Sequence, residues 1–155
     1  MVEPYAFRQA VLDDLQTIGA QRRAMFTEMG VDAAAVARQD EPFRRWAARL
    51  MREGQFVTWF ALSDGVIVAG AGVWIHDWLP GINTPDGVRG YICNVYTNPV
   101  HRGQGLARQL VLRCIEECRS RQVLVVALHA SDAGRPVYEQ LGFTQTNEMR
   151  LALKP

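Results

Sequence analysis

The first fifty residues place apolar side chains in a strand-like and then a helical period. The expected elements are a strand over 5–10, a helix from Asp13 to near Gly30 and a helix from Asp40 to just before Gly54. Asp13 with Gln16 three residues later is a capping-box signal for the first helix. Pro42 would lie in the first turn of the second helix, where a proline is tolerated.

From residue 55 the pattern changes to short apolar runs. Phe56–Leu62 and Val66–Ile75 flank Ser63-Asp64-Gly65, which is typical of a hairpin. The later elements expected are a loop over 79–90, a strand over 91–97, a helix over 103–119, a strand buried on both faces over 123–128, a helix over 133–141 and a strand over 148–153. The strand, helix and strand between 91 and 128 form a βαβ unit with parallel strands.

This element order predicts one mixed α/β (α+β) domain over residues 1–155. A central sheet of about six to seven strands would be flanked by about four helices. With 155 residues, the chain is long enough for one hydrophobic core and short for two.

Composition and charge exclude several classes of protein. The residues are 48% hydrophobic and 21% charged, as in globular domains. A formal net charge of +1 gives no field that would hold nucleic acid or an anionic membrane, so neither is expected as a partner. The N-terminus has no apolar run typical of a secretory signal, which favours the cytoplasm. The three cysteines are expected to be reduced thiols, and no metal site is predicted.

The segment with the clearest chemistry lies where a strand turns into a helix. Arg102-Gly103-Gln104-Gly105-Leu106-Ala107 places two glycines directly before that helix. Backbone N–H groups at a helix N-terminus are unpaired and partly positive, so they suit a phosphate or diphosphate. No Gly-Lys-Ser/Thr follows, and Arg108 stands where a dinucleotide fingerprint needs a third glycine. An ordinary strand-to-helix turn is the alternative interpretation.

Two motifs carry a resemblance to a known family. Arg102, Gly105 and Ala107 match the pattern Arg/Gln-x-x-Gly-x-Gly/Ala, and Asn94-Val95-Tyr96-Thr97-Asn98-Pro99 resembles the strand and turn before it. Val137-Tyr138-Glu139-Gln140-Leu141-Gly142-Phe143 resembles a second signature, leucine-tyrosine-glutamate-x-x-glycine-phenylalanine. On these residues the chain resembles the GNAT superfamily of acyl-CoA-dependent N-acetyltransferases. The resemblance covers the whole element order, and its specific part is residues 91–143.

The resemblance implies acetyl-CoA as the cofactor. Main-chain groups of Val95, Tyr96 and Thr97 would pair with the pantetheine arm, beside a gap between diverging strands. Tyr138 matches the family tyrosine near the CoA sulfur, and Ser131 stands where the family usually has an asparagine that binds the cofactor arm. The diphosphate would be held by Arg102 and by the backbone N–H groups of Gly103, Gln104, Gly105, Leu106, Ala107 and Arg108.

The acceptor amine must lose a proton before it attacks a thioester, since an amine pKa near ~10 keeps it mostly protonated at neutral pH. Many members of the family use a carboxylate on the strand before the motif, but residues 89–98 contain no Asp or Glu. The candidates left for the base are Glu28, His129 and Glu148, each with a structural alternative as a solvated, paired or strand-end side chain. Asn94 could orient a water or the substrate.

The predicted activity is direct transfer of the acetyl group of acetyl-CoA to an amine of a small molecule or peptide. Tyr138 is expected to hydrogen-bond the leaving thiolate, since a phenol is a weaker acid than a thiol. Cys93 has no identified base and is expected to be structural. The alternative is a non-catalytic acyl-CoA-binding sensor or interaction module, because the strand carboxylate is absent. A homodimer is a further expectation. The acceptor pocket is expected to draw on Arg22, Glu28, Trp46, Trp74, Trp78, Asn94 and Glu148.

Overall fold

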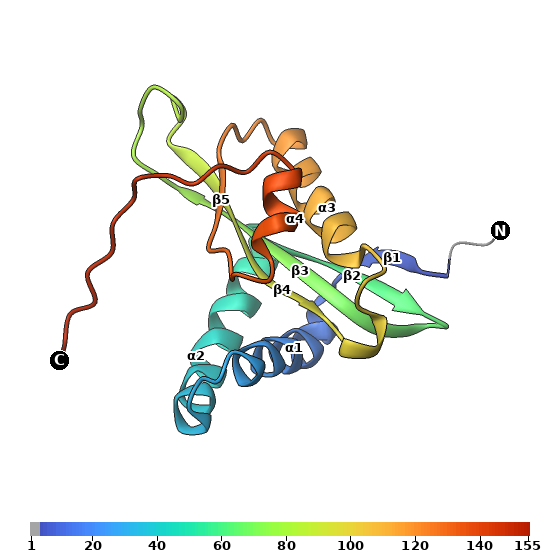
Figure 1. Cartoon of the computed structure of the whole chain (residues 1–155). Coiled ribbons are helices and arrows are strands. Elements are labelled where there is room, and N and C mark those ends of the chain that lie inside the picture. Colours follow the sequence, from blue (N-terminus) through green and yellow to red (C-terminus); the bar gives the residue numbers. More distant parts are fainter. Residues whose placement is uncertain (1–3) are drawn as a thin grey trace.

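The computed structural model describes residues 4–155, and its centre is one twisted sheet (Figure 1). The strands are β1 (Ala6–Gln9), β2 (Phe56–Ser63), β3 (Val66–Asp77), β4 (Val88–Thr97) and β5 (Val126–Leu128). They lie in the order β1-β2-β3-β4-β5, antiparallel except for the parallel pair β4 and β5. The predicted sheet of six to seven strands is therefore wrong: the described residues form five.

Four helices cover the two faces of this sheet (Figure 1). They are α1 (Leu15–Glu28), α2 (Ala33–Arg52), α3 (Leu106–Ser120) and α4 (Arg135–Gln140), with short 3-10 turns at Leu12–Asp14 and Pro99–His101. Helices α1 and α2 pack on one face around Phe56 and Phe60, while α3 and α4 pack on the other around Val73 and Ile92. None of the helices within residues 4–155 is long and apolar enough to cross a membrane.

Close approach of neighbouring side chains to β3 depends on two glycines of that strand, Gly70 and Gly72. A Cβ at Gly72 would lie 2.7 Å from the ring of Phe56, and one at Gly70 would lie 2.3 Å from Oε1 of Gln21. Neither distance is sterically allowed. The small side chains of β3 therefore let α1 and the Phe56 ring sit directly against the strand.

The second helix begins seven residues earlier than predicted from Asp40. Asp32 caps it, with its carboxylate accepting a hydrogen bond from the Ala35 N–H at 3.1 Å, and three alanines with high helix propensity follow. Pro42 consequently lies inside α2 rather than in its first turn. The predicted capping box at Asp13 is also absent: Asp14 instead accepts hydrogen bonds from the Val11 N–H and from Arg8.

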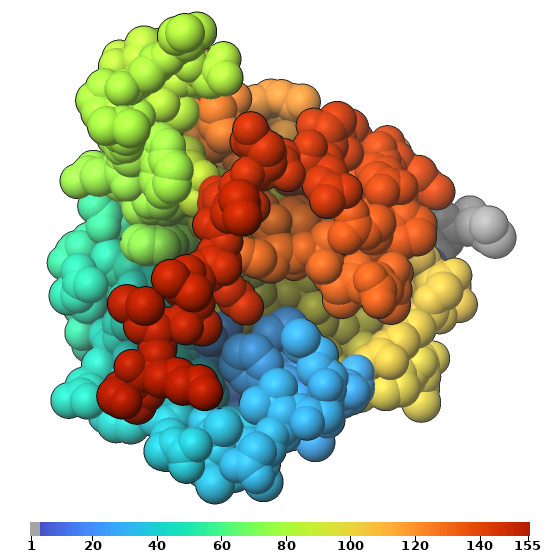
Figure 2. All heavy atoms as spheres, turned by 60° about the vertical axis from the view of Figure 1, so that its left-hand side comes forward, coloured from blue at the N-terminus to red at the C-terminus, as the bar shows by residue number. Residues whose placement is uncertain are grey.

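The C-terminal part of the sheet differs most from the prediction. The strand expected over 123–128 pairs only at Val126–Leu128, and these residues are half-buried rather than buried on both faces. The strand expected over 148–153 does not form, and residues 143–155 run as an extended segment over the surface (Figure 2). Met149, Leu151 and Leu153 alternate as a strand would, but their side chains are exposed. An apolar alternation makes a strand only where a partner edge is paired to it.

Candidate functional site

The strands β4 and β5 separate just before a bulge in β4. Cys93 faces Gly72 of β3 and Tyr96 faces Gly70, so Asn94 and Val95 together oppose the single residue between them. Asn94 adopts a left-handed conformation with φ 55°, as the extra residue of a bulge often does. β5 pairs with β4 only from Gly90 to Ile92. Beyond this point no strand within residues 4–155 pairs with that side of β4, which leaves an open slot.

The N-terminus of α3 lies at the end of this β4 segment. Gly103 and Gly105 both have positive φ, near 75°, and a Cβ on either would meet no atom within 4 Å. Among the described residues, the backbone N–H groups of residues 103–108 donate no hydrogen bond, and the first one that does is Gln109 to the Gly105 carbonyl. The first turn of α3 contains no acidic residue. This is an open, partly positive cradle that fits a diphosphate.

Arg102 is held beside the cradle by two contacts. Its Nε donates to the Thr97 carbonyl at 2.9 Å, and its Nη2 lies 2.6 Å from Oε2 of Glu28 at the end of α1. Glu28, predicted as a candidate base, is thus engaged with Arg102 and lines neither of the two cavities described below.

Tyr138 on α4 packs over the loop that follows β5. A Cβ on Gly134 would lie 3.0 Å from its ring, and Ser131 Oγ accepts the Gly134 N–H at 3.1 Å. Burial raises the pKa of Tyr138, so its hydroxyl keeps its proton at neutral pH. Tyr138 and His129 line a cavity of about 630 Å³ between β5, α4 and the C-terminal segment. His129 Nδ1 is hydrogen-bonded to the Tyr91 hydroxyl.

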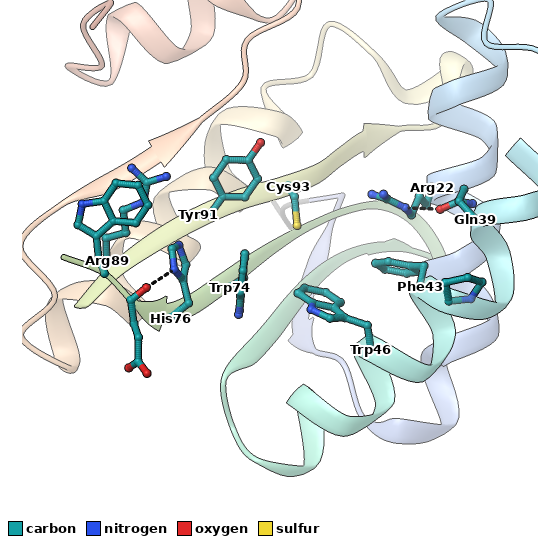
Figure 3. Close-up of a pocket in the computed structure, with 12 residues that line it drawn as sticks. Arg22, Gln39, Phe43, Trp46, Trp74, His76, Arg89, Tyr91 and Cys93 are labelled. Carbon is teal, nitrogen blue, oxygen red and sulfur yellow. Dashed lines mark hydrogen bonds between the residues drawn. The ribbon is translucent and has the colours of Figure 1, made fainter. Parts of the chain in front are cut away.

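A second cavity, of about 710 Å³, opens on the α1 and α2 face of the sheet (Figure 3). Its walls are mainly aromatic, with the Trp46 and Trp74 rings edge to face at 5.4 Å and Phe43 5.8 Å from Trp46. The residues that line it are Arg22, Gln39, Pro42, Phe43, Trp46, Trp74, His76, Asp77, Trp78, Arg89, Tyr91 and Cys93. Arg89 and Tyr91 also line the smaller cavity, so the two spaces adjoin at β4.

Arg22 and Asn94 join the larger cavity to the bulge. Arg22 Nη1 donates to Asn94 Oδ1 at 2.6 Å and its Nε donates to Gln39 Oε1 at 2.7 Å. The guanidinium lies between the rings of Phe26 and Phe43, 4.6 and 4.5 Å from their centroids. Burial lowers the pKa of Arg22, although an arginine stays protonated in proteins.

The sequence-based candidates fall into three groups in space. One group, Val95, Tyr96, Thr97 and the 102–108 cradle, lies along the open slot beside β4. Tyr138 and His129 line the smaller cavity, with Ser131 near them at Gly134. The third group, Arg22, Trp46, Trp74 and Trp78, lines the larger cavity. Glu148 is exposed and lies 3.9 Å from Arg89. Burial raises the pKa of Cys93 to about 12, which keeps it a thiol and speaks against a nucleophilic role.

Sequence reasoning did not place eight of the wall residues in the pocket: Gln39, Pro42, Phe43, His76, Asp77, Arg89, Tyr91 and Cys93. His76 lies on β3, one residue beyond the predicted strand end at Ile75, and stacks on Trp74 with ring centroids 4.1 Å apart. The signal available was the strand period, since His76 follows Trp74 by two positions and Tyr91 precedes Cys93 by two.

Comparison with known proteins gives a consistent result. The model of the acetyltransferase (GNAT) family matches residues 17–143. A GCN5-related N-acetyltransferase from Ralstonia eutropha is 33% identical, with a TM-score of 0.91 over 96% of this chain and 98% of that one. An acetyltransferase from Clostridium acetobutylicum, solved with acetyl-CoA, is 29% identical, with a TM-score of 0.89 over 97% and 96% of the two chains.

A curated relative matches over a shorter segment. Glucosamine 6-phosphate N-acetyltransferase from Trypanosoma brucei brucei is 38% identical over 65 residues, which are 41% of this chain. The match covers 44% of that relative, so the chain is aligned to less than half of its length.

Proposed function

The chain belongs to the acetyltransferase (GNAT) family, and we propose that it transfers the acetyl group of acetyl-CoA directly to an amine of a small molecule. The observation that carries the proposal is the open slot beside β4 that leads into the glycine cradle at α3. A strand edge followed by free helix N–H groups suits a ligand with an amide-bearing arm and a diphosphate. The Clostridium relative solved with acetyl-CoA supports this cofactor.

Different residues around the slot would bind different parts of acetyl-CoA. Backbone groups of Val95, Tyr96 and Thr97 would hydrogen-bond the pantetheine amides, as a further strand would. The N–H groups of residues 103–108, with Arg102 beside them, would bind the diphosphate. Ser131 keeps its O–H free to donate, since its Oγ accepts from the Gly134 N–H. When bound, acetyl-CoA would supply an activated thioester.

Tyr138 donates a hydrogen bond to the sulfur that leaves as a thiolate. Its raised pKa keeps the donor proton in place, and the same shift makes full proton transfer to a thiolate more uphill. The role is therefore stabilisation of developing charge rather than complete acid catalysis.

We assign removal of the amine proton to His129, through the Tyr91 hydroxyl. Tyr91 lines both cavities and is hydrogen-bonded to His129 Nδ1. Burial raises the pKa of Tyr91, so the phenol relays a proton and the imidazole is the group that accepts it. This assignment replaces the carboxylate that β4 lacks, and H129Q should lower the rate of thiol release.

The test is release of free CoA thiol during incubation with acetyl-CoA and a panel of primary amines. Turnover is expected with at least one amine, and Y138F should lower kcat by about 10- to 100-fold with little change in acetyl-CoA affinity. Y5F is the matched control, because the Tyr5 hydroxyl bonds His101 and does not line either cavity. Tight acetyl-CoA binding without thiol release from any amine would favour the sensor function instead.

Three further expectations stay predictions: one acetyltransferase domain over residues 1–155, a cytoplasmic location and a homodimer. The extended segment 143–155, with exposed Met149, Leu151 and Leu153, supports the homodimer because such a segment can pair with the edge of another sheet. Light scattering on the purified chain distinguishes a dimer from a monomer. A peptide amine as acceptor is tested by including peptides in the panel.

A further inference from the structure

The larger cavity contains a cation without a counter-ion. Within residues 4–155, no carboxylate lies within ion-pair distance of Arg22, and its Nη2 makes no hydrogen bond. The carboxylate that its contacts reach is Asp40, but only through the amide of Gln39, and Asp40 is itself 3.6 Å from Arg23. A half-buried guanidinium that lacks an anion is costly to the free protein.

Arg22 is held rigidly in this unpaired state. Two amide oxygens and two aromatic faces fix its guanidinium plane, so little side-chain entropy is lost when an anion binds. The other arginine of the cavity differs, because Arg89 stacks on Trp78 and has Glu148 at 3.9 Å. The arginine that lacks an anionic partner is therefore Arg22, so an anion is expected to bind at that end of the cavity.

A second unsatisfied group lies at the same place. Asn94 is 7% exposed, and its Nδ2 is buried without a hydrogen-bond partner in the described residues. Its amide orientation is determined by chemistry, since the atom facing the Arg22 donor must be the oxygen. Arg22 lines the larger cavity whereas Asn94 does not, so the guanidinium without an acceptor is the group that indicates a bound acceptor, and Asn94 fixes its position.

We propose that Arg22 binds the carboxylate of the acceptor, which is an α-amino acid with an apolar or aromatic side chain. The inference rests on the acetyl transfer proposed above and identifies the substrate of that site. One carbon separates the carboxylate from the α-amine, so anchoring at Arg22 brings the amine to the β4 bulge. The side chain then lies along the wall of Phe43, Trp46 and Trp74 (Figure 3).

The same features disfavour a sugar phosphate at this position. A phosphate dianion favours several donors or cations, whereas one guanidinium matches one carboxylate, bidentately. The hydroxyl groups of a sugar would find few hydrogen-bond partners on the aromatic wall. An apolar side chain has no hydrogen bonds to water to lose when it is buried there. Cavity size agrees, because about 710 Å³ accommodates a small molecule.

The experiment compares amino acids with amines that lack only the carboxylate. Initial rates of thiol release are measured with L-phenylalanine, L-tryptophan, L-leucine and L-methionine, and with their decarboxylated and carboxamide forms. At least one amino acid should exceed its decarboxylated form in kcat/KM by about 30-fold or more. R22Q should remove that preference, mainly through KM. R23Q is the matched control on the same helix and should keep it, because Arg23 is exposed toward Asp40.

A binding readout separates this proposal from the proposed function. Titration of L-phenylalanine, followed by the fluorescence of Trp46 and Trp74, should saturate in the wild type and in R23Q and fail in R22Q. Thiol release from amines regardless of a carboxylate, or an unchanged R22Q, would overturn the carboxylate site and leave acetyl transfer standing. Saturable binding of L-phenylalanine without thiol release would instead support the carboxylate site and contradict the proposed acetyl transfer. A lack of both binding and preference overturns the inference.

Discussion

Asp14 shows how one buried carboxylate holds the first strand to the first helix. Both of its oxygens accept from Arg8, at 2.7 and 2.9 Å, and Oδ2 also accepts the Val11 N–H at 2.8 Å. The hydrogen bond from Arg8 is the main reason that the pKa of Asp14 is lowered from its ordinary value. A carboxylate with a lowered pKa in the folded state stabilises the fold above the unfolded pKa, and that stabilisation is lost as pH falls through the folded pKa.

D14N is therefore expected to lower the free energy of unfolding by about 1–3 kcal/mol at pH 7. The difference from wild type should begin to shrink below about pH 4, where Asp14 of the unfolded chain takes up a proton, and should be lost as the pH falls through the lowered pKa of the folded state. Urea unfolding at pH 7 and at pH 3 measures both values. D13N is the control, since the neighbouring Asp13 is exposed. A pH-independent gap would show that the charge of Asp14 is not the source of stability.

Individual residues near the site were predicted unevenly from the sequence. Tyr138 and the glycines of the cradle were identified because they lie in contiguous motifs, whose chemistry is local. The contact between Arg22 and Asn94 joins residues 72 positions apart, and no local pattern encodes it. Arg22 was expected only as one of several residues of the acceptor pocket. Its unpaired state became evident from the packing of α1 against α2.

At the scale of elements, the backbone conformation of the loop before α3 shapes the proposed binding surface. Gly105 is the N-cap of α3 with φ 75°, where an L side chain is strained but meets no neighbouring atom. Gly54, just after α2, has a similar φ of 71° and equally open space. A substitution by alanine should therefore cost a similar free energy of unfolding at Gly105 and at Gly54. The two positions differ only in their place in the fold.

G105A and G54A should each lower the free energy of unfolding by a similar amount, about 1–2 kcal/mol. Only G105A should weaken acetyl-CoA binding, because its methyl group would occupy the cradle where the diphosphate approaches the N–H groups. Thermal unfolding and calorimetric titration measure the two effects on the same samples. Equal affinity in both variants would remove the cradle from cofactor binding.

The predicted boundaries of helices and strands were wrong where a local sequence signal competed with a stronger neighbouring signal or with the strand pairing of the sheet. Asp40 before Pro42 is a sound helix start by itself, yet Asp32 and the alanines after it start α2 earlier. The run over 123–128 is apolar throughout, but only Val126–Leu128 pairs with β4, opposite Gly90 to Ile92. Residues 148–153 have the right alternation and find no edge within the described chain.

For the whole molecule, acetyl-CoA is expected to bridge the two halves of the sheet. A ligand that binds only the folded state at 100 times its Kd adds about 2.7 kcal/mol to the free energy of unfolding. For a chain of 155 residues this corresponds to a rise in Tm of roughly 5–10 °C. A thermal-shift titration measures it, with G105A as the variant that should respond less. An unchanged Tm in folded wild-type protein would contradict the proposed cofactor.

The order of the elements and the number of helices could be predicted because each element has its own period and its own stop signals. The size of the sheet could not, since strand pairing at an edge depends on geometry set by the whole chain. The aromatic cavity could likewise not be predicted from the sequence, because α1, α2, β3 and β4 each contribute only a part of its wall.

The extra residue in β4 could be removed without turning the residues that follow it. Cys93 lies opposite Gly72 and Tyr96 opposite Gly70, so without Asn94 a single residue, Val95, would face the single residue between those two glycines. Val95 would still pack against the α3 side of the core. Loss of this one codon would therefore straighten the strand and take away the amide oxygen that Arg22 contacts, while every later side chain would keep its face.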